Sequence, residues 1–379
     1  MATPLWKALI LEHRLPTKYK QTIRNIKQLP NMYKACRKAN RDHQNQEQKN
    51  KPKVLLDYSL KNYGRYIFAC SRVFRLAGYD VSVLLNCKLS IIHPFPKKLR
   101  CFYDLGPIDK NIFKEPVNIL YKPPKSPEDY LYLTSEKNPE FLDKGWKDII
   151  GFNFEKEKYS NPKIKKHMQA FPSKKEDSMM MNIFMYPTRY LSEGYNEIKD
   201  LRNNKRQIRA GFIGKTDASV YHKRPTKKLQ SRVEIIESIK KNIKNLKIMD
   251  SEKQLEEKNR FILNNEDFRV DEKRWLQTLS KMDFFLCPSG ESPLCHNLIE
   301  SMAVGTIPIT DHPEYYSPAL EDMKNCIVFD KKNMIEKINK VLNMDQNQIE
   351  KIKKDVIDYY DSYLEPKSWV DYVFKELRL

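Results

Sequence analysis

Hydrophobic residues gather in short runs along the chain, and stretches of helical periodicity separate these runs. The first such unit has an apolar run at 54–56, a polar loop, a helical pattern over 66–76 and a second apolar run at 81–85. Ala77 and Gly78 between them are typical of a helix end. A strand, a helix and a strand within about thirty residues predict two parallel strands joined by a right-handed crossover.

The same alternation returns in the second half of the chain. Residues 210–215 read as a strand that runs into a glycine turn, and the pattern over 233–243 is helical. Further strands are expected at 117–121, 148–152, 182–186, 246–249, 284–287 and 306–309, and further helices at 272–280 and 293–303. The pattern therefore predicts two α/β halves, each with its own parallel sheet.

This pattern divides the chain into four parts. A basic N-terminal extension with a linker covers 1–50, two α/β domains cover 51–205 and 206–345, and a C-terminal helical stretch covers 346–379. Within the extension, 18–38 is helical in pattern and 40–53 reads as a polar linker. The extension either packs as a helix on the first domain or rests as a basic amphipathic helix on an anionic membrane.

Composition narrows the class of protein. The net charge of +20 indicates an anionic partner, which is a nucleic acid, an anionic membrane or a phosphorylated small molecule, although lysine-rich stretches such as 240–247 can also be solvated helix faces. No apolar stretch is long enough to span a membrane, and the N-terminus does not have the pattern of a signal peptide. The seven cysteines are scattered without metal-binding spacing, which indicates reduced thiols in a cytoplasmic protein and no zinc site.

One segment, 284–309, changes from strand to helix within a few residues. Its apolar strand ends in a Pro-Ser-Gly turn at 288–290, after which Ser292 stands at the expected N-cap and Pro293 at the first helical position. A strand, loop and helix of this kind direct unpaired backbone N–H groups to the carboxyl edge of a sheet. We therefore expect a phosphate to bind at this edge.

Two polar residues lie on the helix that follows this turn. Asn297 is one turn beyond Pro293, and Glu300 follows about one turn later. The neighbours of Glu300 are mostly apolar, which predicts a buried carboxylate, and a buried carboxylate needs hydrogen-bond partners. Two vicinal ribose hydroxyls are such partners, so Glu300 is a candidate ribose-binding acid; the alternative is a solvated helix residue.

The segment resembles the donor-binding region of GT-B glycosyltransferases, and within that class it is most similar to the exostosin family. That family has Pro-x-Gly, then Glu-Ala, then Ala-Gly-x-Ile-Pro-Val, and the matching positions here are Pro288, Gly290, Glu300, Ser301, Ala303, Gly305, Ile307, Pro308 and Ile309. Asn297 stands where the family usually has Arg, Cys295 where it usually has Ser, and Val304 separates the alanine from the glycine. A fucosyltransferase-like GT-B enzyme also fits the helix followed by Gly-Thr-x-Pro-Ile. The resemblance covers at most 211–329.

The resemblance implies a GT-B fold, in which two Rossmann-like domains face a central cleft and a C-terminal helix crosses back to pack on the first domain. It implies cations that balance the departing diphosphate, for which Lys215 and Arg232 are the leading candidates; the alternative for either is an ordinary surface residue. It also implies that neither a metal ion nor a cofactor is required. The expected donor-binding residues are Gly214, Lys215, Arg232, Pro288, Ser289, Gly290, Glu291, Ser292, Asn297 and Glu300.

The acceptor side of such an enzyme comes from the first domain. At the carboxyl end of its first strand, the expected residues are Asn62, Gly64 and Arg65. An inverting transfer needs a general base, for which Asp57 is the first candidate and Asp104 the second, although Asp57 is equally explained as a turn acid. His296 either contacts the leaving group or sugar, or packs its helix. A retaining transfer needs no such base, and the stereochemistry stays open.

The function expected from these features is the transfer of a sugar from a UDP- or GDP-linked donor to a saccharide or lipid-linked acceptor in surface-glycan synthesis. The expected place of action is the cytoplasm, with peripheral contact to an anionic membrane face. Two other classes stay open, a non-catalytic relative that binds glycan or nucleotide, and a basic nucleic-acid-binding protein. No zinc finger, helix-turn-helix or stacking pattern supports the last class, so nucleic acid is not expected as a partner.

Overall fold

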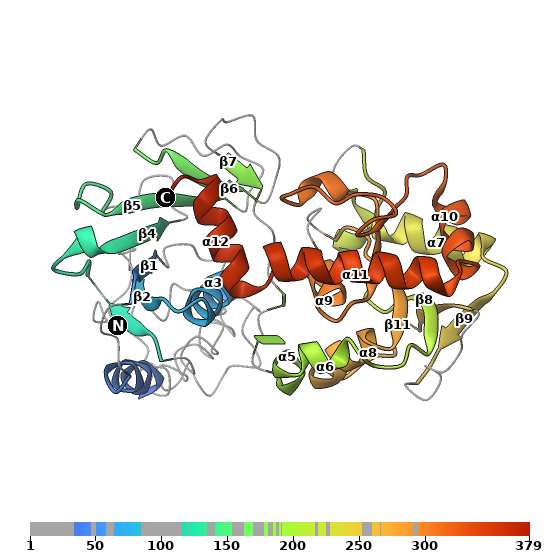
Figure 1. The fold of residues 1–379 in the computed structure, drawn as a ribbon, viewed down its shortest axis with the longest axis horizontal. Helices are drawn as coiled ribbons and strands as arrows, with labels where there is room; N and C mark the ends of the chain where they lie inside the picture. The colour runs from blue at the N-terminus through green and yellow to red at the C-terminus, as the bar shows by residue number, and fades with distance from the viewer. Residues whose placement is uncertain are drawn as a thin grey trace, which may run out of the picture. The chain divides into compact units, whose positions relative to one another are not determined.

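The structure, a computed structural model, describes residues 34–46, 51–57, 64–84, 116–120, 122–134, 141–153, 163–169, 178–180, 185–186, 189–190, 192–216, 219–224, 228–251, 260–265, 267–290 and 295–379. The chain forms two compact units. The first consists of residues 1–152 and 159–166, and the second of residues 153–158 and 167–379. The α/β class that the alternating pattern predicts is confirmed in both units (Figure 1).

The first sheet has the strand order β3-β2-β1-β4-β5-β6-β7, and β1 pairs in parallel with both β2 and β4. Helix α3 packs on β1 and β2 and forms the predicted strand–helix–strand unit with them. The elements are β1 (Lys53–Asp57), α3 (Gly64–Leu76), β2 (Asp80–Leu84), β3 (Asn118–Leu120), β4 (Tyr130–Thr134), β5 (Asp148–Asn153), β6 (Lys166–Gln169) and β7 (Ser178–Met180). Strand β4 was not predicted, and the strand expected at 182–186 is wrong for residues 185 and 186; residues 182–184 lie outside the described part of the chain.

The core of the first unit explains why β4 forms a central strand. Tyr130 and Tyr132 pack with Leu55, Leu84 and apolar residues from beyond β4 in one buried cluster. The Tyr132 ring stacks on Trp146 with 4.4 Å between ring centres. Alternate β4 side chains thus contribute aromatic surface to the core, and aromatic residues suit a pleated strand.

The second sheet has the strand order β13-β12-β11-β8-β10-β9, and all its paired strands are parallel. Its strands are β8 (Ile208–Phe212), β9 (Leu246–Met249), β10 (Phe261–Asn264), β11 (Met282–Leu286), β12 (Ile307–Thr310) and β13 (Ile327–Val328). β10 and β13 were not predicted. Strand β11 is buried along its whole length, as expected for a parallel strand covered on both faces.

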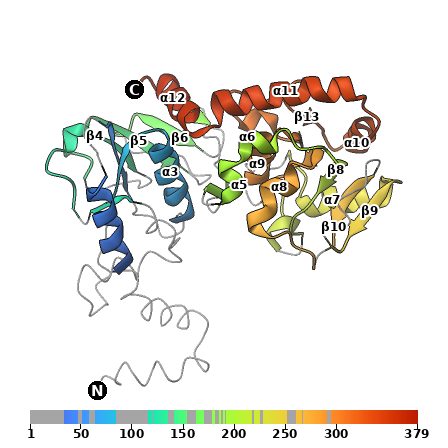
Figure 2. The same ribbon diagram turned by 60° about the horizontal axis from the view of Figure 1, so that its bottom comes forward.

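Helices cover this second sheet in two sets (Figures 1 and 2). Helix α7 contacts α10, while α8 contacts α9, and α9 contacts α11. The helices of the unit are α5 (Glu193–Asn196), α6 (Ile198–Leu201), α7 (Arg232–Asn242), α8 (Trp275–Leu279), α9 (His296–Ala303), α10 (Met334–Leu342), α11 (Gln346–Tyr363) and α12 (Pro366–Glu376). None of the helices in the described part of the chain is sufficiently long and apolar to cross a membrane.

Residues 34–44 form a helix within the first unit that contacts strand β3. The side-chain amide of Asn40 donates to the Ile119 carbonyl at 3.3 Å and accepts from the Ile119 N–H at 2.6 Å, so it occupies the backbone groups of strand β3. His43 and Asp80 form a buried contact of 2.6 Å. Residues 40–44 are therefore helical, and the prediction that they belong to a linker is wrong. The expected membrane contact of the extension stays a prediction, since residues 1–33 lie outside the described residues.

The two compact units divide earlier than the expected boundary at residue 205. Residues 185–206 belong to the second unit because their side chains bond to it. Arg202 donates to the Ala303 carbonyl at 2.8 Å and forms a bidentate pair with Asp361 on α11. Helix α11 in turn packs on α9 and β12. The expected packing of the C-terminal helices on the first domain stays a prediction.

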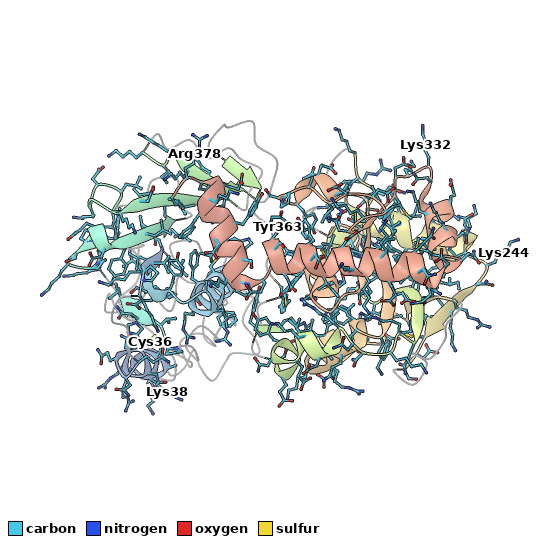
Figure 3. All side chains as sticks on the ribbon, viewed as in Figure 1. Cys36, Lys38, Lys244, Lys332, Tyr363 and Arg378 are labelled. Atoms are coloured by element: carbon cyan, nitrogen blue, oxygen red, sulfur yellow. The ribbon has the colours of Figure 1, made fainter. Side chains whose placement is uncertain are left out.

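Basic side chains are exposed on the second unit. Figure 3 shows Lys244 and Lys332 extending away from the ribbon. Within the lysine-rich stretch 240–247, Ile243 is buried and Lys241 and Lys244 are exposed. This stretch is thus a solvated face beside a buried isoleucine, which is the simpler of the two explanations of its charge.

Candidate functional site

The strand order of the second sheet determines where a ligand binds. Strands β8 and β11 are neighbours. From β8 the chain passes to the edge strand β9 and returns through β10 on one side, and from β11 it continues through β12 to β13 on the other side. In open parallel sheets, ligands bind beyond the carboxyl ends of the strands at this switch point. The candidate site is therefore the end of β8, the end of β11 and the helix starts that follow them.

The turn after β8 is held by a neighbouring strand. The N–H of Gly214 donates to Oδ1 of Asn264, the last residue of β10, at 2.9 Å. A Cβ at Gly214 would lie 2.6 Å from Cζ of Phe212, so only glycine lets the chain turn this closely over the Phe212 ring. Asn264 was missed from the sequence, because the strand that ends with it was not predicted.

Arg232 lies at the start of α7, directly after the capping residue Ser231. Its guanidinium carbon lies 4.1 Å from the centre of the Tyr221 ring and 5.8 Å from that of Phe212, and Nη1 donates to the Lys215 carbonyl at 3.1 Å. The side chain is nearly buried, at 7% exposed, and Nε has no hydrogen-bond partner among the described residues. A nearly buried cation with a free donor is suited to hold an anion.

The end of β11 approaches this guanidinium. A Cβ at Gly290 would lie 3.2 Å from Nη2 of Arg232 and 3.9 Å from Cε1 of Tyr221. Ser289 is fully buried, and its hydroxyl has no partner within the described part of the chain. Of the predicted donor residues, the structure thus brings Gly290 and Arg232 into contact, with Lys215 joined through its backbone and Ser289 next along the chain.

Helix α9 begins later than expected. Its first residue is His296, and its N-cap is Cys295, which has an extended backbone and makes no side-chain cap. The prediction that α9 has its N-cap at Ser292 is therefore wrong; Glu291, Ser292 and Pro293 themselves lie outside the described residues. Cys295 is buried, and its extended backbone (φ −126°, ψ 128°) does not continue the helix toward the N-terminus.

Two arginines hold the other end of α9. Arg202 donates to the Ala303 carbonyl, and Arg206 donates to the carbonyls of Val304 and Gly305 at 2.9 and 3.1 Å. Burial lowers the pKa of Arg206 to about 10, which leaves it charged at neutral pH. The two arginines lie where the dipole of α9 is negative, and its amino end carries the partial positive charge, which favours an anion near His296.

Glu300 is almost fully buried, at 1% exposed, and the protein itself supplies its partners. The backbone N–H of Tyr186 donates to Oε1 at 2.8 Å, and Nε1 of Trp275 donates to Oε2 at 2.6 Å. Nε of Arg189 lies 3.7 Å from Oε1. Burial raises the pKa of Glu300, while Arg189 and the two donors oppose this rise. The predicted burial is confirmed. A ribose contact stays untested, and burial no longer argues for it because the partners are protein groups.

His296 lies at the start of α9 and packs edge-on against the Tyr186 ring, with 5.5 Å between ring centres. Both side chains are partly exposed, as is Asn297. His296 and Asn297 therefore occupy the helix end that the sequence assigned to the donor site. Pro288 is buried two residues after the end of β11 and has no polar side-chain group to offer a donor.

Of the candidate residues of the first unit, Asp57 is the one whose side chain the structure describes. Asp57 is fully buried at the end of β1, and its Oδ2 accepts from the Tyr132 hydroxyl at 2.6 Å and from Thr134 Oγ1 at 3.3 Å. These contacts favour a structural role for Asp57 at the end of the strand over the role of a general base that contacts the acceptor. Gly64 starts α3, the Arg65 side chain is not described, and Asn62 and Asp104 lie outside the described residues.

One buried polar group at the carboxyl edge of the second sheet was missed. His312 follows β12, and its Nδ1 lies 2.7 Å from Oδ1 of Asp311 and 3.2 Å from Oγ1 of Thr310. Its ring stacks on Tyr316 with 6.1 Å between centres. The sequence offers a signal for this group, since an Asp-His pair directly follows the apolar strand. Among the described residues, no group of three or more His, Cys, Asp or Glu side chains is placed to hold a metal ion.

The sequence of the second unit matches a known family. Residues 198–357, less than half of the chain, match the family described as "Glycosyl transferases group 1". This match contains β8 to β13 and the residues around Arg232, Gly290 and Glu300. It confirms that the chain is a glycosyltransferase, and with two parallel Rossmann-like sheets it confirms the GT-B class. No curated protein is significantly similar in sequence.

Several solved structures are similar to the chain at low sequence identity. A glycosyltransferase from Rickettsia africae has a TM-score of 0.47 and 11% identity, covering 87% of this chain and 99% of that one. Anabaena HepE in complex with UDP-glucose has a TM-score of 0.42 and 10% identity, covering 86% and 99%. TarM of S. aureus in complex with UDP has a TM-score of 0.41 and 11% identity, covering 67% and 56%.

Proposed function

Starting from a glycosyltransferase domain over residues 198–357, we propose that the enzyme transfers a sugar from a UDP- or GDP-linked donor to a saccharide or lipid-linked glycan acceptor in surface-glycan synthesis. The observation that carries this proposal is the contact between Arg232 and Gly290 at the switch point of the second sheet. A nearly buried guanidinium beside the turn after β11, whose Nε has no hydrogen-bond partner in the described part of the chain, suits the diphosphate of such a donor.

The chemistry of the transfer assigns roles to these groups. The oxygen of an acceptor hydroxyl forms a bond to the anomeric carbon of the sugar, the bond from that carbon to the diphosphate oxygen breaks, and the nucleoside diphosphate leaves with the bonding electrons. The hydroxyl proton passes to a general base in an inverting transfer or to the departing diphosphate in a retaining one. Arg232 and the start of α9 stabilise the negative charge that develops on the leaving group. His296, at the first position of α9, is our candidate contact to the leaving group or the sugar.

The proposed transfer does not require a metal ion. A cationic side chain and a helix start at the switch point supply the charge that a metal would otherwise supply. Activity that is retained in EDTA, with the same rate after addition of Mg²⁺ or Mn²⁺, is the expected result. Loss of transfer in EDTA and its recovery with either metal would contradict this part of the proposal. The exostosin-like subfamily is likewise a proposal, which rests on the pattern from Pro288 to Ile309.

A thermal-shift screen against UDP, GDP, CMP and their sugars tests the proposal. A ligand that binds the folded state raises the melting temperature by mass action. We expect a shift with one nucleoside diphosphate, and we expect Arg232→Met to reduce it. Lys228→Met is the matched control, because Lys228 is exposed and close in sequence. The absence of any shift for the wild type across the screen would reject the proposal, and the identified donor then enters a transfer assay.

A further inference from the structure

Glu300 connects α9 to a distant part of the chain. Its Oε1 accepts from the Tyr186 backbone N–H and its Oε2 accepts from the Trp275 indole. The guanidinium carbon of Arg189 lies 6.0 Å from the Tyr186 ring centre and 5.9 Å from that of Trp275, so the cation lies near both rings and the carboxylate. All four residues belong to the second unit.

Further bonds fix the chain around Tyr186. The Met185 N–H donates to the Tyr190 hydroxyl at 3.3 Å, and Arg189 Nη1 donates to the Glu272 carbonyl at 2.5 Å. The Arg189 N–H donates to the Tyr186 carbonyl at 2.8 Å, which closes a turn. The described residues from 185 to 190 thus form a closed loop, which we call the Tyr186 loop. The bond from the Tyr186 N–H to Glu300 joins this loop to α9.

The Tyr186 loop reaches the candidate site through one side chain. The Tyr186 ring packs edge-on against His296, the first residue of α9. Glu300 lies one turn further along the same helix, and it holds the backbone N–H of Tyr186 itself. The carboxylate therefore fixes where the tyrosine ring stands relative to the histidine.

We infer that Glu300 is a positioning residue, which anchors the Tyr186 loop and so places the Tyr186–His296 pair at the donor-binding end of α9. This role differs from the ribose contact expected from the sequence. It rests on the proposed function, because the pair matters for catalysis only where a nucleotide-sugar binds. A carboxylate whose two oxygens already accept two protein donors keeps its geometry without a ligand.

The first test needs no ligand. In Glu300→Gln, one oxygen of the carboxylate is replaced by an amide N–H₂ that cannot accept, so either Tyr186 or Trp275 loses its acceptor. We expect backbone hydrogen exchange over 185–190 to become at least tenfold faster in Glu300→Gln and in Trp275→Phe. Trp146→Phe is the control, since it removes an indole bond to the Phe141 carbonyl in the first unit. Unchanged exchange over 185–190 in both variants would overturn the anchor.

The second test separates an anchor from a ribose ligand. Calorimetry measures the affinity for the diphosphate that the donor screen identifies, UDP or GDP, and for its 2′,3′-dideoxy form. An anchor predicts that Glu300→Gln and Tyr186→Leu weaken both ligands by the same factor, roughly tenfold, and that the double variant is no weaker than either single one. A ribose ligand predicts a loss for the hydroxylated nucleotide alone, which would overturn the inference.

The two tests also distinguish a failure of the proposed function from a failure of the inference about Glu300. If the wild type binds none of the nucleotides, the proposed function fails while the exchange result still decides whether Glu300 anchors the loop. If the wild type binds and Tyr186→Leu binds equally well, the proposed function survives and the inference fails. Tyr186→Leu retains the backbone N–H that Glu300 accepts, so it removes the ring and leaves the anchor in place.

Discussion

The guanidinium of Arg232 lies over the ring of Tyr221, with 4.1 Å between the guanidinium carbon and the ring centre. A cation over an aromatic face is stabilised by about 0.5–2 kcal/mol, more when it is removed from water. Arg232 is nearly buried, and Tyr221 is partly exposed, so the ring covers the face of the cation and leaves its edge toward Gly290. Tyr221 therefore orients the cation that we assign to the diphosphate.

Replacing Tyr221 by leucine removes the aromatic face beneath Arg232. We expect Tyr221→Leu to weaken nucleotide binding roughly threefold to tenfold, which corresponds to about 1 kcal/mol. Tyr221→Phe retains the ring and should bind nearly as tightly as the wild type. Calorimetric titration of the three proteins with the identified nucleoside diphosphate measures this. Equal losses for leucine and phenylalanine would point to the hydroxyl instead of the ring.

Gly290 leaves room for the Arg232 side chain. In Gly290→Ala the new Cβ would lie 3.2 Å from Nη2 of Arg232, so the guanidinium must move by a few tenths of an ångström. We expect weaker nucleotide binding, with a change in the free energy of unfolding below about 1 kcal/mol. The control is Gly194→Ala in α5, where the nearest atom would lie 3.5 Å away, and there alanine should stabilise the helix by about 0.5–1 kcal/mol. Nucleotide affinity that stays at the wild-type value in Gly290→Ala would separate Gly290 from the binding site.

Arg206 connects the ends of α8 and α9. It donates to the carbonyls of Ser280, Val304 and Gly305, and in Arg206→Met these acceptors lose their charged donor inside the protein. We expect a loss of about 2–3 kcal/mol in the free energy of unfolding, measured by urea denaturation. Arg269→Met is the control, because Arg269 is exposed and bonds only to the neighbouring Phe268 carbonyl among the described residues. Equal stability of the two variants would mean that water replaces the lost donor.

The ionisation of Glu234 makes the stability contributed by the start of α7 depend on pH. The hydrogen bond from Arg224, together with those from Ser231, lowers the pKa of Glu234 to about 2 from an ordinary value of 4.5. A lowered acid pKa stabilises the folded state above the ordinary value, and this contribution is lost as the pH falls from about 4.5 toward 2. Both partners are partly exposed, so solvent screening limits the contribution to below about 1 kcal/mol.

Glu234→Gln measures that contribution directly. Glutamine retains the capping bond to the Ser231 N–H but loses the charge that pairs with Arg224. The stability difference between the wild type and Glu234→Gln in urea denaturation should therefore shrink between pH 6 and pH 3. A difference that stays constant over this range would assign the effect to hydrogen bonding alone.

Local pattern was sufficient for the elements that carry their own signal. The run at 284–286, the glycine turn after 212 and the helix at 233–242 all lie where the sequence predicts them. Strand β10 was missed because three apolar residues, 261–263, do not distinguish a strand from a buried helix turn. Strand β4 was missed because its tyrosines interrupt the apolar run, and the Tyr132 hydroxyl bonds to Asp57 on another strand.

Site residues were predictable where their own segment carries the signal. Contacts between segments that are distant in the sequence were not predictable. Arg232 and Gly290 were expected as donor residues from their positions after strands, and the structure places them in contact. Burial of Glu300 was also expected from its neighbours. Its partners were not, because Tyr186 and Trp275 come from segments that carry no local signal of a bond to α9.

The position of β10 between β8 and β9 has a consequence for the order in which the second sheet can assemble during synthesis. Strand β9 leaves the ribosome before β10, but its only paired strand in the described sheet is β10. A nascent chain that ends at residue 251 therefore contains β8, α7 and β9 without the strand that joins β8 to β9. This part of the sheet closes only when residues 261–264 emerge, and until then both strands expose unpaired edges that other chains can bind.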